Sequence, residues 1–307
     1  MFLIFINIDL ALLKNEILKT RPLPLFIAMA LNIPHLYIKS FRWNYLLRQQ
    51  NIFFSYWETF LIYLSSLYIG FITPGRMGEF VKAFYLKSFK NISLSKAFPS
   101  VLLDRLFDLY LLIILGFIGI LKFNIFGKLS SAFFLLSIIF VMVPLIMLNR
   151  NFMKKLTKLL YNFAVLNKVK GKIEENFQDF YNGLYKLINP KLLVSGLLTC
   201  FGYLLFFIQC YLIVIAIGLS VNFITITLFM AITNLISFIP ISISGLGTRD
   251  ASLIYLFSLI ELNPELAVSY ALLVFITFFV IGGLMGAGAY WIKPLSLDRQ
   301  IETQLKT

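Results

Sequence analysis

Three clusters of charged residues interrupt apolar stretches of the chain, and the first has residue types that suit anion binding. In Thr73–Glu79 a proline and two glycines, Gly75 and Gly78, precede or flank Arg76 and Glu79. Proline and glycine end a helix. A helix that begins after them presents free N–H groups and the positive end of its dipole. An arginine beside such a helix N-terminus predicts a phosphate site.

The second cluster, Pro240–Asp250, repeats this order of residues. Gly245 and Gly247 interrupt the helix, and Arg249 and Asp250 open a new one that is too short to cross a bilayer. Paired interrupted segments in corresponding halves of a chain are typical of the substrate site of an inverted-repeat transporter. Re-entrant segments would enter from opposite sides. If each piece spans instead, the distribution of lysine and arginine is similar, so charge leaves both arrangements open.

The third cluster consists of Asp104, Arg105 and Asp108. Asp104 and Asp108 are four residues apart and share one face of a helix. Because buried charges are normally paired, the cluster is interpreted as an ion-pair group that neutralises Arg76 or Arg249. The alternative is that one of the two acids titrates and couples protons to transport.

Composition places these clusters in a membrane protein. Of the 307 residues 60% are hydrophobic and only 13% are charged, and an ordinary soluble domain has roughly 25% charged residues. This composition excludes a disordered chain, a collagen-like chain and a disulfide scaffold, and argues against a soluble enzyme. Cys200 and Cys210 have no metal-ligand spacing, and His35 is the single histidine. We therefore expect no metal site, no cofactor and no catalytic residue.

Long apolar runs cover most of the chain, and a helix needs about 20 apolar residues to cross a bilayer. The runs are continuous rather than alternating, which excludes a β-barrel. The first run is short and is either a retained span or a signal peptide, of which we favour the span. We predict an all-α polytopic membrane protein, residues 1–307 forming one integral membrane domain of about eight membrane segments with two re-entrant broken helices. The runs are 2–13, 23–38, 59–72, 106–121, 129–148, 192–219, 223–243, 251–260 and 267–292.

Residues 150–190 are polar and predict two amphipathic helices with lysines on one face. They lie either in the lipid headgroup layer or as a hairpin that caps the bundle. Nine lysines and arginines between 150 and 191 indicate the cytoplasmic side and place the C-terminus there as well, in a multi-pass protein of the cell membrane. The net charge of +13 follows from this topology, so no nucleic-acid partner is expected.

At these motifs the chain resembles the lysylphosphatidylglycerol synthase transmembrane-region family, in order and over nearly its whole length. Members of the family usually have glutamate at the position of Asp250, more proline and glycine at 241–243, and an arginine near the middle of 267–292. This sequence departs from the family at all three places. The matching pieces are Arg42-Trp43 with Leu46-Leu47, Thr73–Glu79 with Lys82, Asp104–Leu109, and residues 239–251.

The resemblance implies a polytopic protein that moves or handles lipids with anionic headgroups. Members of the family include aminoacyl-lipid flippase domains and archaeal proteins linked to polyprenyl-phosphate carriers. Fused members carry a separate soluble synthase domain, for which this chain has no room, so we expect no enzyme activity. The expected partners are anionic membrane lipids, with a homo-oligomer or a lipid-modifying enzyme as further partner classes.

We therefore expect translocation of an anionic phospholipid or a polyprenyl-phosphate lipid between leaflets. Two other classes stay open: a membrane-embedded lipid-phosphate transferase, and a non-transporting partner of lipid-modifying enzymes. In the expected site Arg76 and Arg249 hold the phosphate. Glu79 and Asp250 either position these arginines or open and close the path. The cluster of Asp104, Arg105 and Asp108 balances charge, and glycines let the backbone bend, namely Gly75, Gly78, Gly245 and Gly247.

Overall fold

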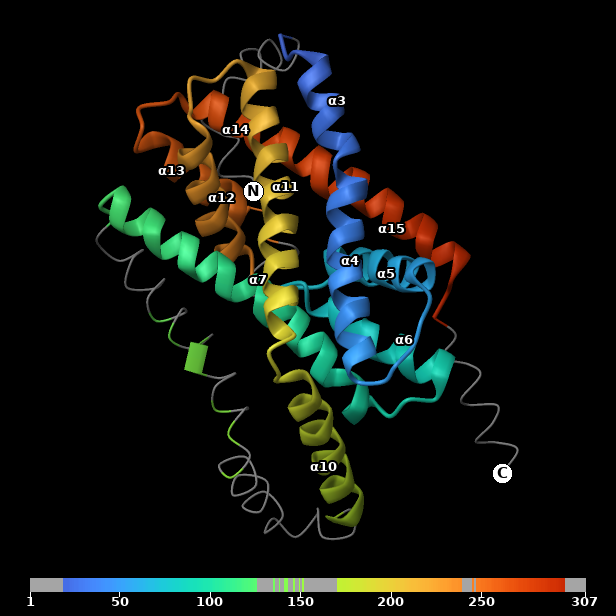
Figure 1. Ribbon diagram of the computed structural model, residues 1–307. Helices are drawn as coiled ribbons and strands as arrows, with labels where there is room; N and C mark the ends of the chain where they lie inside the picture. Colours follow the sequence, from blue (N-terminus) through green and yellow to red (C-terminus); the bar gives the residue numbers. More distant parts are fainter. Residues whose placement is uncertain are drawn as a thin grey trace.

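Helices form all the regular structure in the part of the chain that the computed structural model describes (Figure 1). Described are residues 19–125, 170–238, 245, 247–295 and isolated positions between 135 and 151. In these residues the predicted all-helical fold is confirmed. The predicted run 2–13, most of run 129–148 and the first amphipathic helix lie outside these residues, so the number of membrane segments stays a prediction.

The first half of the described chain begins with two nearly continuous helices, α3 and α4. A helical hairpin made of α5, η1 and α6 follows, and the long helix α7 ends this half. Helices α3 and α4 are separated at Leu31, because Pro34 has no N–H to donate to the carbonyl of Ala30. Helix α5 begins with a capping box in which the side chains of Ser55 and Glu58 each accept a backbone N–H. The elements are α3 (Pro22–Ala30), α4 (Asn32–Gln49), α5 (Tyr56–Ile72), the 3-10 helix η1 (Met77–Phe80), α6 (Val81–Lys90) and α7 (Leu94–Lys122).

The second half begins with the predicted amphipathic helix and ends with one long helical run. Its last element is continuous from Pro264 to Ile292, with a π-helical segment in the middle. The elements are α10 (Lys170–Leu187), α11 (Leu192–Ile217), α12 (Phe223–Ser237), α13 (Thr248–Ser258), α14 (Pro264–Val274), the π-helical η3 (Phe275–Val280) and α15 (Ile281–Ile292).

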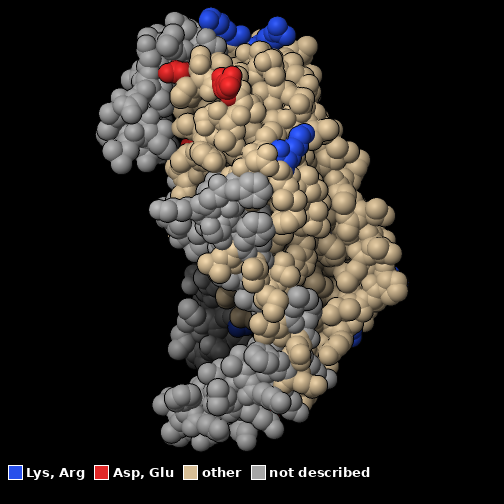
Figure 2. Space-filling view, turned by 90° about the vertical axis from the view of Figure 1, so that its left-hand side faces the viewer, with Lys and Arg blue, Asp and Glu red and all other residues tan. Residues whose placement is uncertain are grey.

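Two described helices are both long enough and apolar enough to cross a membrane, Leu192–Ile217 and Pro264–Ile292. Helix α12 is also apolar but has only 15 residues. Below the charged groups at its upper end, the described part of the face in Figure 2 carries few charged side chains. A surface of this kind is suited to hydrocarbon.

The connections gather at two ends of the bundle. The start of α3, the α11–α12 connection and the α13–α14 connection lie at the upper end in Figure 1, and α10 and the α6–α7 connection lie at the lower end. Helix α10 buries Tyr181, Leu184 and Leu187 in the same apolar core as residues of α7. The predicted second amphipathic helix thus packs its apolar face on protein.

Helices α5 and α15 pack closely because a glycine lies between them. A Cβ atom at Gly286 would lie 2.7 Å from the carbonyl oxygen of Leu64 and from the Cβ of Tyr68. We expect Gly286→Ala to lower the free energy of unfolding by about 1–3 kcal/mol, since overpacked atoms must move apart. Unfolding by sodium dodecyl sulfate in mixed micelles measures this value.

Gly288, two residues along the same helix, is a matched control, because a Cβ atom there meets no atom within 4 Å. Gly288→Ala is expected to cause no loss of stability. Equal losses in the two variants would show that close approach of α5 and α15 does not set the effect.

Candidate functional site

Both interrupted segments fold back on themselves as helical hairpins. In the first hairpin α5 returns through η1 and α6, so closely that a Cβ at Gly78 would lie 2.5 Å from the carbonyl oxygen of Ile69. In the second hairpin α12 returns as α13, and the hydroxyl of Ser252 donates to that of Thr233 at 3.4 Å. Each predicted cluster of glycine, arginine and acid therefore lies at the tip of a hairpin.

The tip of the first hairpin holds two successive residues in the left-handed region, Gly75 with φ 59° and Arg76 with φ 57°. The N–H of Gly78 donates to the hydroxyl of Thr73 at 2.7 Å and closes the turn. A left-handed conformation costs an arginine energy that a glycine does not incur, and such conformations cluster at binding sites.

The tip of the second hairpin has Gly245 and Gly247 at φ 77° and 86°. One carboxylate oxygen of Asp250 accepts the N–H of Gly247 at 3.1 Å, and the other accepts Nη2 of Arg249 at 2.7 Å. Asp250 thus fills part of the N-terminus of α13 and fixes the direction of Arg249. The rest of this motif, residues 239–244 and 246, lies outside the described residues.

The two tips meet at a single aromatic ring. The guanidinium carbon of Arg76 lies 5.3 Å, and that of Arg249 4.8 Å, from the centre of the Phe279 ring. Phe279 belongs to the π-helical segment, and such segments are frequent at functional sites. Asn32 donates to the carbonyl of Thr277 in the same segment at 2.8 Å, which satisfies a backbone group of the irregular turn.

A cavity of about 70 Å³ lies where the tips meet, and both arginines line it. Among the described residues no carboxylate forms an ion pair with Arg76, and its buried Nε donates to no atom. Nη1 of Arg249 is also buried and has no hydrogen-bond partner among the described residues, and the side chain as a whole is only 3% exposed. Buried donors without acceptors are costly, and an anion in the cavity would satisfy them.

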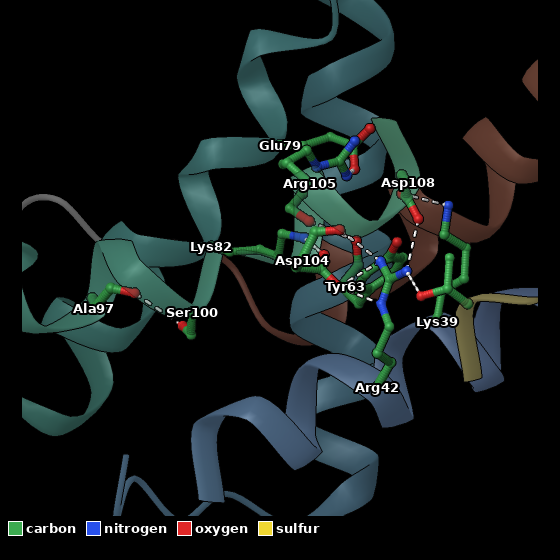
Figure 3. A network of polar contacts seen from close by, with 12 residues as sticks. Lys39, Arg42, Tyr63, Glu79, Lys82, Ala97, Ser100, Asp104, Arg105 and Asp108 are labelled. Atoms are coloured by element: carbon green, nitrogen blue, oxygen red, sulfur yellow. Dashed lines mark hydrogen bonds and ion pairs between the residues drawn. The ribbon is translucent and has the colours of Figure 1, made fainter. Parts of the chain in front are cut away.

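The third cluster forms a buried ion-pair network beside this cavity (Figure 3). Asp104 accepts hydrogen bonds from Nε and Nη2 of Arg42 at 2.9 and 2.7 Å and from the ammonium group of Lys82 at 2.6 Å. Asp108 accepts Nη1 of Arg42 at 2.8 Å and the ammonium group of Lys39 at 2.8 Å. Both carboxylates are at most 1% exposed, and they face one guanidinium, as their spacing on α7 predicts.

The partners in the network differ from those expected from the sequence. Asp104 and Asp108 pair with cations of α4 and α6 instead of Arg76 or Arg249, and Glu79 pairs with Arg105 instead of Arg76. Neighbouring residues of a helix point roughly 100° apart. Arg105 therefore points away from Asp104, and it lies beside Glu79 of the first hairpin, as Figure 3 shows.

Sequence reasoning missed the central cations of the network. Arg42 and Lys82 belong to the motifs only through the family resemblance, and Lys39 belongs to none of them. A signal for two of these cations exists, because Lys39 and Arg42 are three residues apart on one face of a helix that starts in an apolar run. Their partners in α7 are far away in sequence, at a separation of 62 residues for Arg42 and Asp104.

Comparison with known proteins agrees with the motifs. The model of the family described as "Lysylphosphatidylglycerol synthase TM region" matches residues 1–286. A UPF0104 membrane protein of Methanocaldococcus jannaschii is 25% identical, over 93% of this chain and 88% of the relative. UPF0104 membrane proteins of Methanothermobacter thermautotrophicus and Pyrococcus horikoshii are each 23% identical, over 90% and 81% of this chain and 87% and 81% of the relatives.

No solved structure matches the chain significantly. The relatives are named as membrane proteins, and the family match covers nearly the whole chain, including both hairpins and the ion-pair network. The chain is a membrane protein, and it belongs to the lysylphosphatidylglycerol synthase transmembrane-region family.

Proposed function

We propose that this protein moves an anionic lipid, a phospholipid or a polyprenyl-phosphate lipid, between the leaflets of the cell membrane. The observation that supports this proposal is the meeting of Arg76 and Arg249 at one cavity, each with a buried N–H that has no acceptor among the described residues. Arginine donors in a fixed geometry are the preferred partners of phosphate oxygens. The lipid phosphate would enter the cavity, and its apolar tails would remain in hydrocarbon.

We also propose that the two hairpins are re-entrant and related as an inverted repeat. Helix α12, with 15 residues, is about 22 Å long, and the hydrocarbon core is about 30 Å thick. Helix α5, with 17 residues, is about 25 Å long. Irregular backbone at membrane depth must face protein or a wet cavity, and both tips face the cavity.

The acids have separate roles in this proposal. Asp250 directs Arg249 toward the cavity, and Glu79 holds Arg105 beside it. Asp104 and Asp108 hold α4, α6 and α7 together around Arg42. The lysine-rich end that carries α10 is proposed to face the cytoplasm, with the C-terminus on the same side.

A leaflet-asymmetry assay in proteoliposomes tests the function. Tail-labelled phosphatidic acid, phosphatidylglycerol and phosphatidylcholine are placed in the inner leaflet, and an external quencher reports their arrival outside. We expect the protein to accelerate the exchange of at least one anionic lipid above that of phosphatidylcholine. Because the protein is proposed to move lipid without altering it, mass spectrometry should recover each lipid unchanged.

Exchange no faster than in protein-free liposomes for all three lipids would overturn the proposal. A recovered lipid that has lost or gained a headgroup would favour a transferase instead.

A further inference from the structure

The charges that line the cavity do not balance. Among the lining residues, cations outnumber carboxylates by two. The excess is still two when the charged residues behind the lining are counted as well, namely Arg42, Lys82, Asp104 and Asp250. The lining cations are Lys39, Arg76, Arg105 and Arg249, and the lining carboxylates are Glu79 and Asp108. An uncompensated charge away from water is costly, so the site is suited to a ligand with two negative charges.

The carboxylates are already occupied by partners inside the protein. Glu79 pairs with Arg105, and Asp108 pairs with both Arg42 and Lys39. Arg76 and Arg249 each keep a donor with no acceptor among the described residues. They belong to separate hairpins, and both guanidinium groups contact the ring of Phe279. Donors from two directions are able to bind different oxygens of the same phosphate.

The size of the cavity also limits the headgroup. A volume of about 70 Å³ corresponds to about two water molecules at roughly 30 Å³ each, so the space suits a small group such as a phosphate. The walls of the cavity combine phenylalanine rings, namely Phe71, Phe206, Phe278 and Phe279, with a few neutral polar side chains, among them Asn32, Tyr63 and Asn234.

We infer that the cavity binds a lipid whose headgroup is a terminal phosphate monoester, in preference to a phosphodiester. A monoester carries close to two negative charges at neutral pH and has three terminal oxygens, whereas a diester carries one charge and has two such oxygens. This inference rests on the proposed function, because it names the headgroup that the same two arginines hold.

Two lipids that differ by one methyl group test the inference. Dioleoyl phosphatidic acid is a monoester, and dioleoyl phosphatidylmethanol is the corresponding diester. Binding to the purified full chain in detergent is measured by native mass spectrometry titration at pH 8 and pH 5. At pH 8 we expect the monoester to bind about tenfold tighter or better, and at pH 5, where it loses its second charge, we expect the preference to vanish.

Two controls distinguish the effect of the charge on the lipid from the effect of charges on the protein. The charge of phosphatidylmethanol is constant between pH 5 and pH 8, so a change in its affinity over this range reports any contribution from titrating groups of the protein. Arg76→Gln removes one excess charge and should abolish the preference at pH 8. Lys191→Gln removes an equal charge from the exposed start of α11 and should retain it.

Equal affinity for the two lipids at pH 8, with both affinities lost in Arg76→Gln, would overturn the monoester inference and leave the phosphate site in place. Equal affinity that Arg76→Gln does not change would overturn the phosphate site as well.

Discussion

Replacing Arg42 by methionine is expected to lower the free energy of unfolding by about 3–5 kcal/mol, because the change leaves buried carboxylates without their main partner. Arg42 donates to both Asp104 and Asp108 and to the hydroxyl of Thr199, and its side chain is 1% exposed. It therefore joins α4 to α7 and α11. Titration with sodium dodecyl sulfate in mixed micelles measures the loss.

Arg48 provides the control in the same helix. It is exposed, donates one hydrogen bond to the buried Asn44 and lies over the ring of Tyr56. Arg48→Met therefore removes an equal charge at the cost of one hydrogen bond and one cation–π contact, about 1–2 kcal/mol. Equal destabilisation by the two substitutions would mean that the network does not hold these helices together.

Asp104→Asn separates the structural interpretation of the acids from proton coupling. Since Asp104 is bound by Arg42 and Lys82, we expect the substitution to lower stability and to leave the pH profile of lipid exchange where it is in the wild type. A shifted pH profile with unchanged stability would support proton coupling through this acid.

Loss of the two hairpin arginines is expected to have the largest effect on transport. Each of Arg76→Ala and Arg249→Ala removes a charged hydrogen-bond donor from the cavity, which should slow exchange of anionic lipid about tenfold. The double variant should be about a hundredfold slower if the two losses add. Exchange rates in proteoliposomes, normalised to reconstituted protein, measure the effect.

Stability distinguishes this effect from misfolding. Arg76 has no carboxylate partner among the described residues, so its loss should lower the free energy of unfolding by only about 1–2 kcal/mol, through its contacts with the rings of Phe71 and Phe279. Arg249→Ala leaves Asp250 without its ion pair, although Asp250 keeps the N–H of Gly247, and a modest loss of stability is expected. A folded double variant that exchanges lipid as fast as the wild type would show that the arginines do not hold the phosphate.

Much of the fold follows from patterns that are local in sequence. The length of an apolar run predicts a membrane helix, and a proline or glycine beside a charge predicts where the helix breaks. Both features depend on neighbouring residues, so the order of residue types alone identifies Thr73–Glu79 and Pro240–Asp250 as related segments. Local sequence therefore predicts the helical fold and the position of Arg76 and Arg249 at helix interruptions.

The partners of the buried charges are decided by tertiary packing. Asp104 and Arg42 are 62 residues apart, and nothing in either segment distinguishes this pairing from one with Arg76 or Arg249. Phe279 is one apolar residue in a long apolar run, and only the π-helical turn and the packing of two hairpins place its ring against both arginines. Local sequence fixes where a charge sits along its helix, but long-range packing fixes the direction it faces, because the energy of a buried charge depends on the partners that other helices supply.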